Sequence, residues 1–306
     1  MKPLGQYPAA RHVVAHVSDT HLLAGGAALY GAANTIATLE QAMVQLERLD
    51  PAPEAIVFTG DLADLGEPDA YERLKAVVVP AAERMGAEIV WVMGNHDERE
   101  PYASILFGEE PTDAPQDRVH MVGGLRIVSL DTTVRGYHHG DLDDAQLEWL
   151  AGVLAEPAPE GTLIAVHHPP IPTPLMAAME MLELRGQHRL EAVVRGTDVR
   201  GILGGHLHYT THSMFAGVPV SVAAATCYTM ALTTGDRLIS GVDANQAVNL
   251  VHVYDDRIVH TTVPLGDRPE ITGFTADAIA AIESMTPDQR DDAFSRKVPT
   301  LHVDGL

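Results

Sequence analysis

Five short apolar runs of this sequence each end in a small group of aspartate, asparagine or histidine residues. The groups are Ser18-Asp19-Thr20-His21, Gly60-Asp61-Leu62-Ala63-Asp64, Gly94-Asn95-His96-Asp97, His167-His168 and Gly204-Gly205-His206-Leu207-His208. Carboxylates, amides and neutral imidazoles suit zinc, manganese or iron, whereas copper(I) prefers sulfur. Any one group has an ordinary explanation as a turn, a helix cap or a surface loop. Five such groups, each directly after an apolar run, indicate a metal site instead.

The apolar runs that carry these groups are rich in β-branched residues and lack polar alternation, which predicts strands buried on both faces. The predicted strands are Val13–Val17, Ala55–Thr59, Glu88–Met93, Leu125–Leu130, Thr162–Val166 and Val199–Leu203. Helical patterns fall between them at Thr35–Arg48, Pro68–Arg84, Asp143–Leu154 and Leu190–Arg195, and Asp143 with Gln146 predicts a capping box. Since ligands bind at the carboxyl ends of the strands in an open α/β sheet, the five groups should converge there.

The pattern changes to a period of two after His208. Alternation predicts strands at Ser213–Phe215, Val218–Ala223, Val248–Tyr254 and Ile258–Val263, with a hairpin turn at Phe215–Val218. The fold class is therefore α/β, with a more antiparallel second half. We expect a long surface loop at Thr233–Ala247. We also expect a main domain at 1–265, followed by an extension at 266–306 that holds a helix at Thr275–Ser284 and a polar tail.

Composition limits the class of protein. The chain has 306 residues, 46% of them hydrophobic, and a formal net charge of -22, which fits one large or two modest globular domains and excludes a mostly disordered chain. The single cysteine, Cys227, excludes an intrachain disulfide, thiolate-rich zinc sites and iron–sulfur clusters. We find no signal peptide, and the apolar run Val218–Ala225 is too short to cross a membrane. We therefore expect a cytoplasmic protein with no integral membrane segment, and no nucleic-acid partner because acidic surfaces repel phosphates.

The order of the motifs carries a resemblance to a known family. Asp-x-His, Gly-Asp, Gly-Asn-His-Asp, His and Gly-His-x-His, from Asp19 to His208, resemble the calcineurin-like metallophosphoesterases. The segments His16–His21, Phe58–Asp64 and Ala224–Thr229 are similar to the class III bacterial cyclic nucleotide phosphodiesterases, above all their mycobacterial branch. This resemblance implies a four-layer α/β/β/α sandwich of two mixed sheets flanked by helices, and a homodimer.

The resemblance also implies roles for individual residues. Asp19, His21, Asp61 and His208 would hold a first metal, and Asp61 would bridge to a second metal held by Asn95, His167 and His206. The implied metals are iron and manganese, although the same ligands accept zinc. His96 would face the phosphate as hydrogen-bond donor or general acid, with Asp97 orienting it. The expected substrate contacts are Asn95, His96, His208 and His139.

The implied reaction is hydrolysis of 3′,5′-cyclic nucleotides, above all cyclic AMP, by in-line attack of a hydroxide that bridges the two metals. The alternatives are a broader phosphodiesterase that takes 2′,3′-cyclic nucleotides or glycerophosphodiesters, and a non-catalytic metal-binding scaffold. A protein phosphatase is disfavoured, because Arg99 is the one arginine beside the ligand motifs.

For several further residues the sequence is compatible with either a functional or a purely structural role. Asp64 and Asn34 either support the ligands or have surface and capping roles, and Asp97 could instead cap a helix at Glu98–Phe107. His138 and His139 either line the substrate pocket or are ordinary loop residues. Tyr30 and Cys227 either shape that pocket or pack in the interior, and Trp91 and Trp149 are assigned to the core.

Overall fold

The computed structural model describes residues 4–174, 177–233, 240–266 and 269–296. The chain divides into two compact units, one formed by Ala10–Gly266 and the other by the described residues of 1–9 and 267–306. The predicted boundary after residue 265 falls beside this division, and independent folding of the two parts stays a prediction. All the predicted ligands belong to the larger unit.

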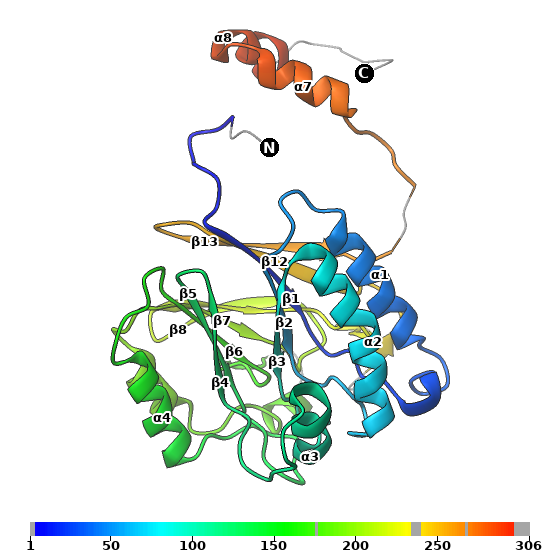
Figure 1. Cartoon of the computed structure of the whole chain (residues 1–306), viewed down its shortest axis with the longest axis vertical. Coiled ribbons are helices and arrows are strands. Elements are labelled where there is room, and N and C mark those ends of the chain that lie inside the picture. The colour runs from blue at the N-terminus through cyan, green and yellow to red at the C-terminus, as the bar shows by residue number, and fades with distance from the viewer. Residues whose placement is uncertain (1–3, 175–176, 234–239, 267–268, 297–306) are drawn as a thin grey trace. The chain divides into compact units, whose positions relative to one another are not determined.

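The first sheet of the larger unit has the strand order β13-β12-β1-β2-β3 (Figure 1). Its strands are β1 (His12–Val17), β2 (Ala55–Thr59), β3 (Glu88–Val92), β12 (Ala247–Val253) and β13 (Ile258–Pro264). Strands β1, β2 and β3 run parallel, whereas β12 pairs antiparallel with both β1 and β13. The carboxyl ends of β1, β2 and β3 therefore open on the same edge.

The second sheet has the order β4-β5-β6-β7-β9-β8. Its strands are β4 (Arg118–Val122), β5 (Leu125–Leu130), β6 (Thr162–Val166), β7 (Val199–Gly204), β8 (Thr211–Phe215) and β9 (Val218–Val222). The four central strands run parallel, and β4 and β8 are antiparallel edges. The predicted hairpin joins β8 to β9 through Ala216 and Gly217, whose φ angles are 54° and 91°, as a tight hairpin turn requires.

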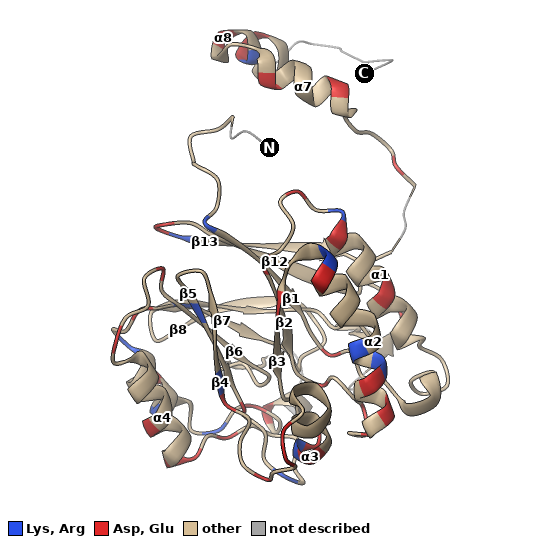
Figure 2. Ribbon diagram, in the orientation of Figure 1, with Lys and Arg blue, Asp and Glu red and all other residues tan. Residues whose placement is uncertain are grey.

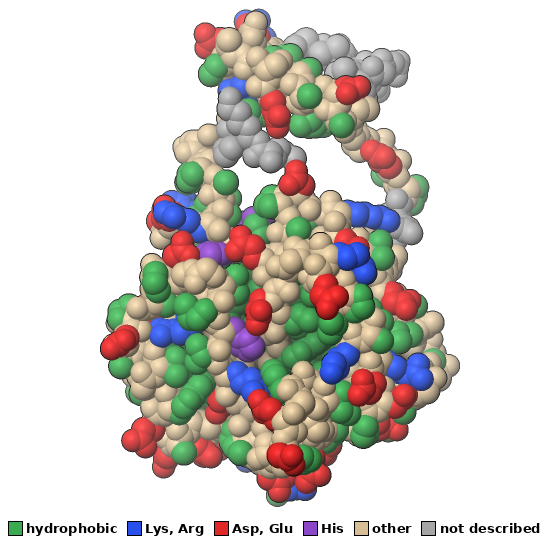
Figure 3. Space-filling model, viewed as in Figure 1, with side chains coloured by type: hydrophobic (Ala, Val, Ile, Leu, Met, Phe, Trp, Pro, Cys, Tyr) green, Lys and Arg blue, Asp and Glu red, His purple; other side chains and the backbone are tan. Residues whose placement is uncertain are grey.

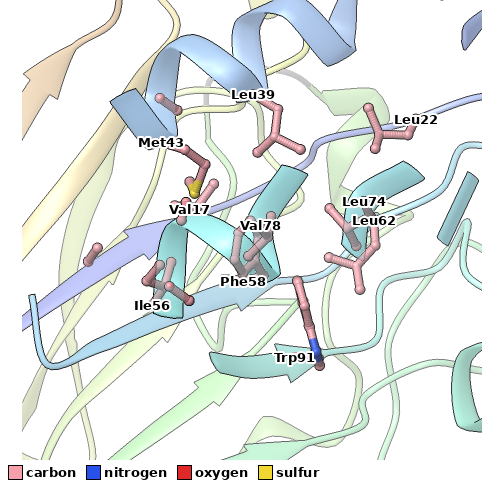
Figure 4. Close-up of a cluster of buried hydrophobic side chains, with 14 of the residues drawn as sticks. Val17, Leu22, Leu39, Met43, Ile56, Phe58, Leu62, Leu74, Val78 and Trp91 are labelled. Carbon is pink, nitrogen blue, oxygen red and sulfur yellow. The ribbon is translucent and has the colours of Figure 1, made fainter. Parts of the chain in front are cut away.

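Four layers follow from three groups of buried side chains. Helices α1 (Thr35–Glu47) and α2 (Pro68–Met85) cover the outer face of the first sheet through contacts such as Leu39, Leu74 and Phe58 (Figure 4). Helices α4 (Asp144–Leu154) and α6 (Gln187–Val194) cover the outer face of the second sheet. The two inner faces pack on each other through β-branched and leucine side chains such as Val57 and Leu163. The four-layer sandwich of two mixed sheets is thus confirmed.

Both tryptophans pack against the core as predicted, but they differ in how deeply they are buried. Trp91 is buried and packs at 4.7 Å, between ring centroids, against Phe58. Trp149 is only partly buried and packs against the outer side of the second sheet's core. The predicted capping box is present, since the Asp143 side chain accepts a hydrogen bond from the Gln146 backbone amide and the Gln146 side-chain oxygen accepts one from the Asp143 backbone amide.

The remaining elements are short. They are a 3₁₀ turn at Ala24–Gly26, α3 (Arg99–Pro101), a π-helical turn at Tyr102–Leu106, α5 (Ala177–Glu180), β10 (Thr229–Met230) and β11 (Gly241–Val242). The smaller unit holds α7 (Ala276–Ser284), with Thr275 as its N-cap, then α8 (Pro287–Arg290) and a π-helical turn at Asp291–Ser295. No helix within the described residues is long and apolar enough to span a membrane.

Two local predictions need correction. The predicted helix Glu98–Phe107 is instead the single turn α3 followed by the π-helical turn. Pro101 lies in the first turn, where a backbone N–H would have no acceptor within the helix. The predicted loop Thr233–Ala247 includes residues 234–239, which lie outside the described residues. Its remainder contains β11, which pairs with β10, and the first residue of β12.

Candidate metal centre

The structure brings all seven predicted ligands to one place, at the carboxyl ends of β1, β2, β3, β6 and β7. Nε2 of His21 and Nε2 of His167 each lie 3.3 Å from Oδ2 of Asp61. Nε2 of His208 lies 3.4 Å from Oδ1 of Asp19. These segments are far apart in the sequence, so it is the sheet order that assembles the cluster.

The backbone at the ligands adopts conformations that non-glycine residues rarely adopt. Asp19, His21, Asp61, His206 and His208 have φ angles of 52°, 43°, 49°, 70° and 55°. Such left-handed residues cost free energy, and they persist where the surrounding structure holds them in place for a function. Glycines 94 and 205 allow the close approach, because a Cβ at these positions would overlap Asp61 and Ser18.

The ligand atoms fall into two groups that share Asp61. Asp19, His21, Asp61 and His208 offer four ligand atoms within 4.8 Å of one another. In the second group, Nε2 of His167 lies 3.0 Å from Oδ1 of Asn95 and 3.2 Å from Nδ1 of His206. Since Asp61 touches His21 and His167 with the same oxygen, it is placed to bridge two cations.

An unsatisfied atom of the cluster fits metal binding. Among the described residues, Nε2 of His21, which lies beside Asp61, is buried without a hydrogen-bond partner. Burial and then the positive charge of His167 lower the pKa of His206 to about 3, which keeps it in the neutral form that binds metals. Burial would raise the pKa of the Asp61 carboxyl, but His167 and His21 outweigh it and hold that pKa well below its usual range. The residues present therefore fit two divalent cations.

A further layer of contacts fixes the orientation of the ligand rings. Nδ1 of His21 lies 2.9 Å from Oδ1 of Asp64, and Nδ1 of His167 lies 2.7 Å from the Thr59 carbonyl. Nδ1 of His208 lies 3.0 Å from the Tyr228 carbonyl. Such partners leave Nε2 free to face a metal. Of the two supporting residues suggested by the sequence, Asp64 has this role, whereas the Asn34 side chain caps α1 by accepting from the Ala37 amide.

His96 lies at the open side of the cluster, where a substrate could reach it. Its side chain is 28% exposed, and its ring centroid is 4.7 Å from that of His21. Its backbone amide donates to Oδ1 of Asp61 at 2.8 Å, and its Nδ1 lies 2.9 Å from the Asp64 carbonyl. His96 is therefore fixed at one end of its ring and accessible at the other.

The predicted contact between Asp97 and His96 is wrong. The Asp97 carboxylate is buried and accepts hydrogen bonds from the backbone amides of Leu62, Ala63 and Gly94, at 3.1, 3.0 and 2.9 Å. It also accepts one from the Tyr71 hydroxyl at 2.9 Å. Burial and the nearby Asp61 charge raise the pKa of Asp97 to about 6. Asp97 thus joins the loops after β2 and β3, and Asp64 is the carboxylate that contacts His96.

The structure separates the two neighbouring histidines of the loop after β5. Nδ1 of His138 accepts from the Asn95 amide at 2.8 Å, and its ring lies 5.2 Å from that of His96. His139, the expected substrate contact, is buried and packs against Tyr137 at 5.2 Å between ring centroids. His138 is therefore the residue of this pair that adjoins the predicted ligands.

His168 is a residue that the sequence placed beside the site without giving it a role. Its ring lies 4.5 Å from that of His206, and it belongs to a buried group with His167 and His206. Both of its ring nitrogens are engaged, Nδ1 at 2.8 Å from Thr132 Oγ1 and Nε2 at 3.1 Å from the His138 carbonyl. His168 therefore supports the ligands, and only its position next to His167 could have indicated this.

The structure also shows where Tyr30, Cys227 and Arg99, named from the sequence, lie, and it adds Tyr228. The Tyr228 ring lies 4.4 Å from that of His208, and Cys227 is buried with Sγ 3.7 Å from Nδ1 of the same histidine. Tyr30 is 76% exposed, so it does not pack in the interior. Arg99 is paired with the buried Asp131 at 3.2 Å, which leaves it bound to the protein rather than free for a phosphate dianion.

The acidic charge is spread over the larger unit. Figure 2 shows aspartate and glutamate on loops and helix surfaces of this unit, and Figure 3 shows red and blue side chains interspersed over the visible face. Arginine and glutamate also pair across the surface, as in Arg84–Glu47 and Arg118–Glu109. Cations at the cluster would provide the local positive field that a small anion needs.

Comparison with known proteins decides the family. The sequence profile of the calcineurin-like phosphoesterases matches residues 12–210, which contain every predicted ligand. The chain belongs to this family. Within it, the chain is 50% identical over 295 residues to a protein of Mycobacterium tuberculosis named a cAMP/cGMP dual specificity phosphodiesterase. That match covers 94% of this chain and 92% of the mycobacterial protein.

Other proteins resemble the chain more distantly. A 3′,5′-cyclic adenosine monophosphate phosphodiesterase of Pseudomonas aeruginosa is 30% identical over 226 residues, covering 73% of this chain and 79% of that protein. Among solved structures, a dimetal phosphatase from Danio rerio superposes with a TM-score of 0.59, 16% identity, and coverage of 83% of this chain and 96% of that one. That superposition confirms the fold of the family.

Proposed function

We propose that this calcineurin-like phosphoesterase is a metal-dependent phosphodiesterase that hydrolyses 3′,5′-cyclic nucleotides, cyclic AMP above all, to nucleoside 5′-monophosphates. One observation carries the reaction class: a single oxygen of Asp61 lies 3.3 Å from a histidine of each ligand group. That arrangement suits two cations that share one carboxylate. The 50% identity to a named cAMP/cGMP phosphodiesterase supports the substrate class.

The protein's own residues would hold the two cations in place. Asp19, His21, Asp61 and His208 would hold one, and Asp61, Asn95, His167 and His206 the other. When bound, such a pair supplies Lewis acidity and a deprotonated water at neutral pH. The buried carbonyl of Thr59 and the carboxylate of Asp64 would keep His167 and His21 in the ligating orientation.

His96 would act on the leaving oxygen. Breaking the bond between phosphorus and O3′ leaves an alkoxide that needs a proton, and the exposed end of the His96 ring can donate it. Asp64 holds the other end of that ring, with its Oδ1 at 3.5 Å and its carbonyl at 2.9 Å from Nδ1. Asn95, fixed by its contacts with His167 and His138, would orient a phosphoryl oxygen.

The metal identity, assembly and location are further parts of this proposal. The nitrogen and oxygen ligands suit iron with manganese, and they also accept zinc. A homodimer and a cytoplasmic location fit a phosphodiesterase that acts on a soluble nucleotide. Metal analysis of the protein as purified from its own host would separate the three metals.

The test compares kcat/KM for 3′,5′-cyclic AMP, 2′,3′-cyclic AMP and glycerophosphocholine, with manganese-loaded protein. The proposal predicts the highest value for the 3′,5′-cyclic nucleotide. A clear preference for glycerophosphocholine or 2′,3′-cyclic AMP would establish the broader phosphodiesterase instead. If neither these substrates nor bis(4-nitrophenyl) phosphate is hydrolysed at any metal loading, the protein is the non-catalytic metal-binding scaffold instead.

A further inference from the structure

A pocket of about 270 Å³ opens beside the first group of ligands. Its lining includes Leu29, Tyr30, Ala33, Tyr228, Met230 and Asp243. Tyr228 joins the pocket to the ligands, because its ring lies 4.4 Å from that of His208 and 6.4 Å from that of His21. A molecule bound at the metal centre could therefore extend into this pocket.

The backbone holds Tyr30 at the pocket in an unusual conformation. Tyr30 has a φ of 52°, which bulky side chains rarely adopt, and yet its side chain is 76% exposed. A tight loop fixes this geometry, since Leu29 and Ala33 exchange backbone hydrogen bonds at 2.8 and 3.0 Å. Packing in the interior does not explain an exposed ring held this way, so it points to a ligand.

The walls of the pocket suit a flat, uncharged ring. The Tyr30 and Tyr228 rings lie 5.8 Å apart between centroids at an angle of 64°. Beneath them, Leu29, Ala33 and Cys227 form a small buried apolar cluster. Asp243 is the one charged residue among the described lining residues, and its negative charge disfavours a phosphate there. An amino group on a heteroaromatic ring could donate a hydrogen bond to its carboxylate.

A larger cavity on the other side of the cluster is less suitable for such a ring. This cavity, of about 520 Å³, adjoins Asn95 and is lined by charged side chains that include Arg99 and Arg135. Both arginines are paired, Arg99 with Asp131 and Arg135 with Asp113. Its lining thus mixes charged residues with apolar ones such as Met93 and Ile105, whereas the pocket at Tyr30 is mainly aromatic and apolar.

We infer that the pocket at Tyr30 and Tyr228 holds the nucleobase of the cyclic nucleotide, and that Tyr30 is a specificity-determining residue. The inference rests on the proposed function. The phosphate would lie at the metal centre while the base lies against the two tyrosine rings. Because stacking grows with ring area, a purine base would bind better than a pyrimidine base.

The test uses two variants of Tyr30 in the full-length, manganese-loaded protein. Tyr30→Asn removes the ring but tolerates the left-handed backbone, and Tyr30→Phe retains the ring as the matched control. The substrates are cyclic AMP and trimethylene phosphate, a six-membered cyclic diester with no base. We expect Tyr30→Asn to raise KM for cyclic AMP about tenfold, as loss of one stacking partner does, with kcat and the hydrolysis of trimethylene phosphate unchanged.

The outcomes separate the inference from the proposed function. Tyr30→Phe should match the wild type on both substrates, and AMP should bind about tenfold more weakly to Tyr30→Asn in calorimetry. If the wild type hydrolyses cyclic AMP and Tyr30→Asn has an unchanged KM for it, the inference is overturned and the proposed function stands. Equal losses on both substrates would also overturn the inference, because they would indicate a disturbed metal centre. A wild type inactive on cyclic AMP would instead refute the proposed function.

Discussion

Oδ2 of Asp61 lies 3.3 Å from Nε2 of His167, across the interface between the two sheets. The same oxygen lies 3.3 Å from Nε2 of His21, within the first sheet's own set of loops. Asp61 follows β2 and His167 follows β6, so the contact also fixes how the sheets meet. Asp61 is therefore the ligand whose loss should affect both metal sites.

Asp61→Ala should remove both metals, whereas Asn95→Ala should weaken only the second. The reason is that Asp61 contributes to both ligand groups, while the side-chain hydrogen bonds of Asn95, within the described part of the chain, join it to His167 and His138. Elemental analysis of the purified variants measures the metals per chain. Two full equivalents in Asp61→Ala would contradict the bridging role.

His96→Ala should retain both metals and lose turnover by a factor of about 10² to 10⁴, the usual contribution of a general acid. The metals should remain because the backbone amide of residue 96, which donates to Asp61, is unchanged by the substitution. The measurement pairs kcat with metal content. A variant without metal would show that His96 is a ligand.

Asp64→Ala should weaken metal binding by about 10- to 100-fold, as removal of a ligand's hydrogen-bond partner commonly does. Asp64 contacts Nδ1 of both His21 and His96, at 2.9 and 3.5 Å. The control is Asp69→Ala, which removes an exposed carboxylate paired with Arg73. Titration of metal into each variant, monitored by calorimetry, should show weaker binding to Asp64→Ala than to Asp69→Ala. Equal affinities would show that Asp64 does not support the metal ligands.

Asp97→Ala should destabilise the fold rather than act on the chemical step. The substitution leaves three backbone amides and the Tyr71 hydroxyl without their acceptor, which should cost about 2–4 kcal/mol. Urea unfolding with a chelator present measures this without the contribution of metal. Unchanged stability with a large loss of kcat would restore Asp97 to a direct catalytic role.

Stability should fall as the pH falls below 6.5, in part because of His16. Burial, then the nearby His260, lower the pKa of His16 to about 3 in the folded chain, whereas the unfolded value is about 6.5. Between these values only the unfolded chain takes up the proton, so acid favours unfolding. From pH 6.5 to 5 this group alone should cost about 2 kcal/mol.

The comparison variant for this pH dependence is His16→Gln, which retains a hydrogen-bonding group near Thr59 Oγ1, 2.9 Å from Nε2 of His16. Chelator-treated wild type and variant are unfolded in urea at pH 6.5 and 5. The variant should lose less stability over this interval. The same loss in both proteins would show that the pKa of His16 does not differ between the folded and the unfolded chain.

The sequence predicts the buried strands well, and for physical reasons. Ala55–Thr59 and Thr162–Val166 are continuous apolar runs, and the structure has the same bounds. By contrast, β4 is not predicted, because Arg118 and His120 interrupt its apolar residues and it pairs on one side only. An edge strand needs less hydrophobicity than a central one, so its pattern is weak.

The contacts behind the ligands are harder to predict because they depend on the path of tight turns. Asp97 directly follows His96, which suggests a contact, but the Asp97 amide bonds back to the Gly94 carbonyl at 3.1 Å and the turn directs its side chain inward. Likewise, no pattern indicates that Tyr30 is exposed, because its position depends on the closed loop between Leu29 and Ala33.

The most direct test of the central claim is the identity of the product formed from 3′,5′-cyclic AMP. The manganese-loaded protein is incubated with this substrate in ¹⁸O-labelled water, and the nucleotides are separated and examined by mass spectrometry. We predict that the product is adenosine 5′-monophosphate with one ¹⁸O on phosphorus. We also predict that His96→Ala protein, although it retains both metals, no longer forms this product at an appreciable rate. Adenosine 3′-monophosphate as the product, or intact cyclic AMP after prolonged incubation, would contradict the central claim.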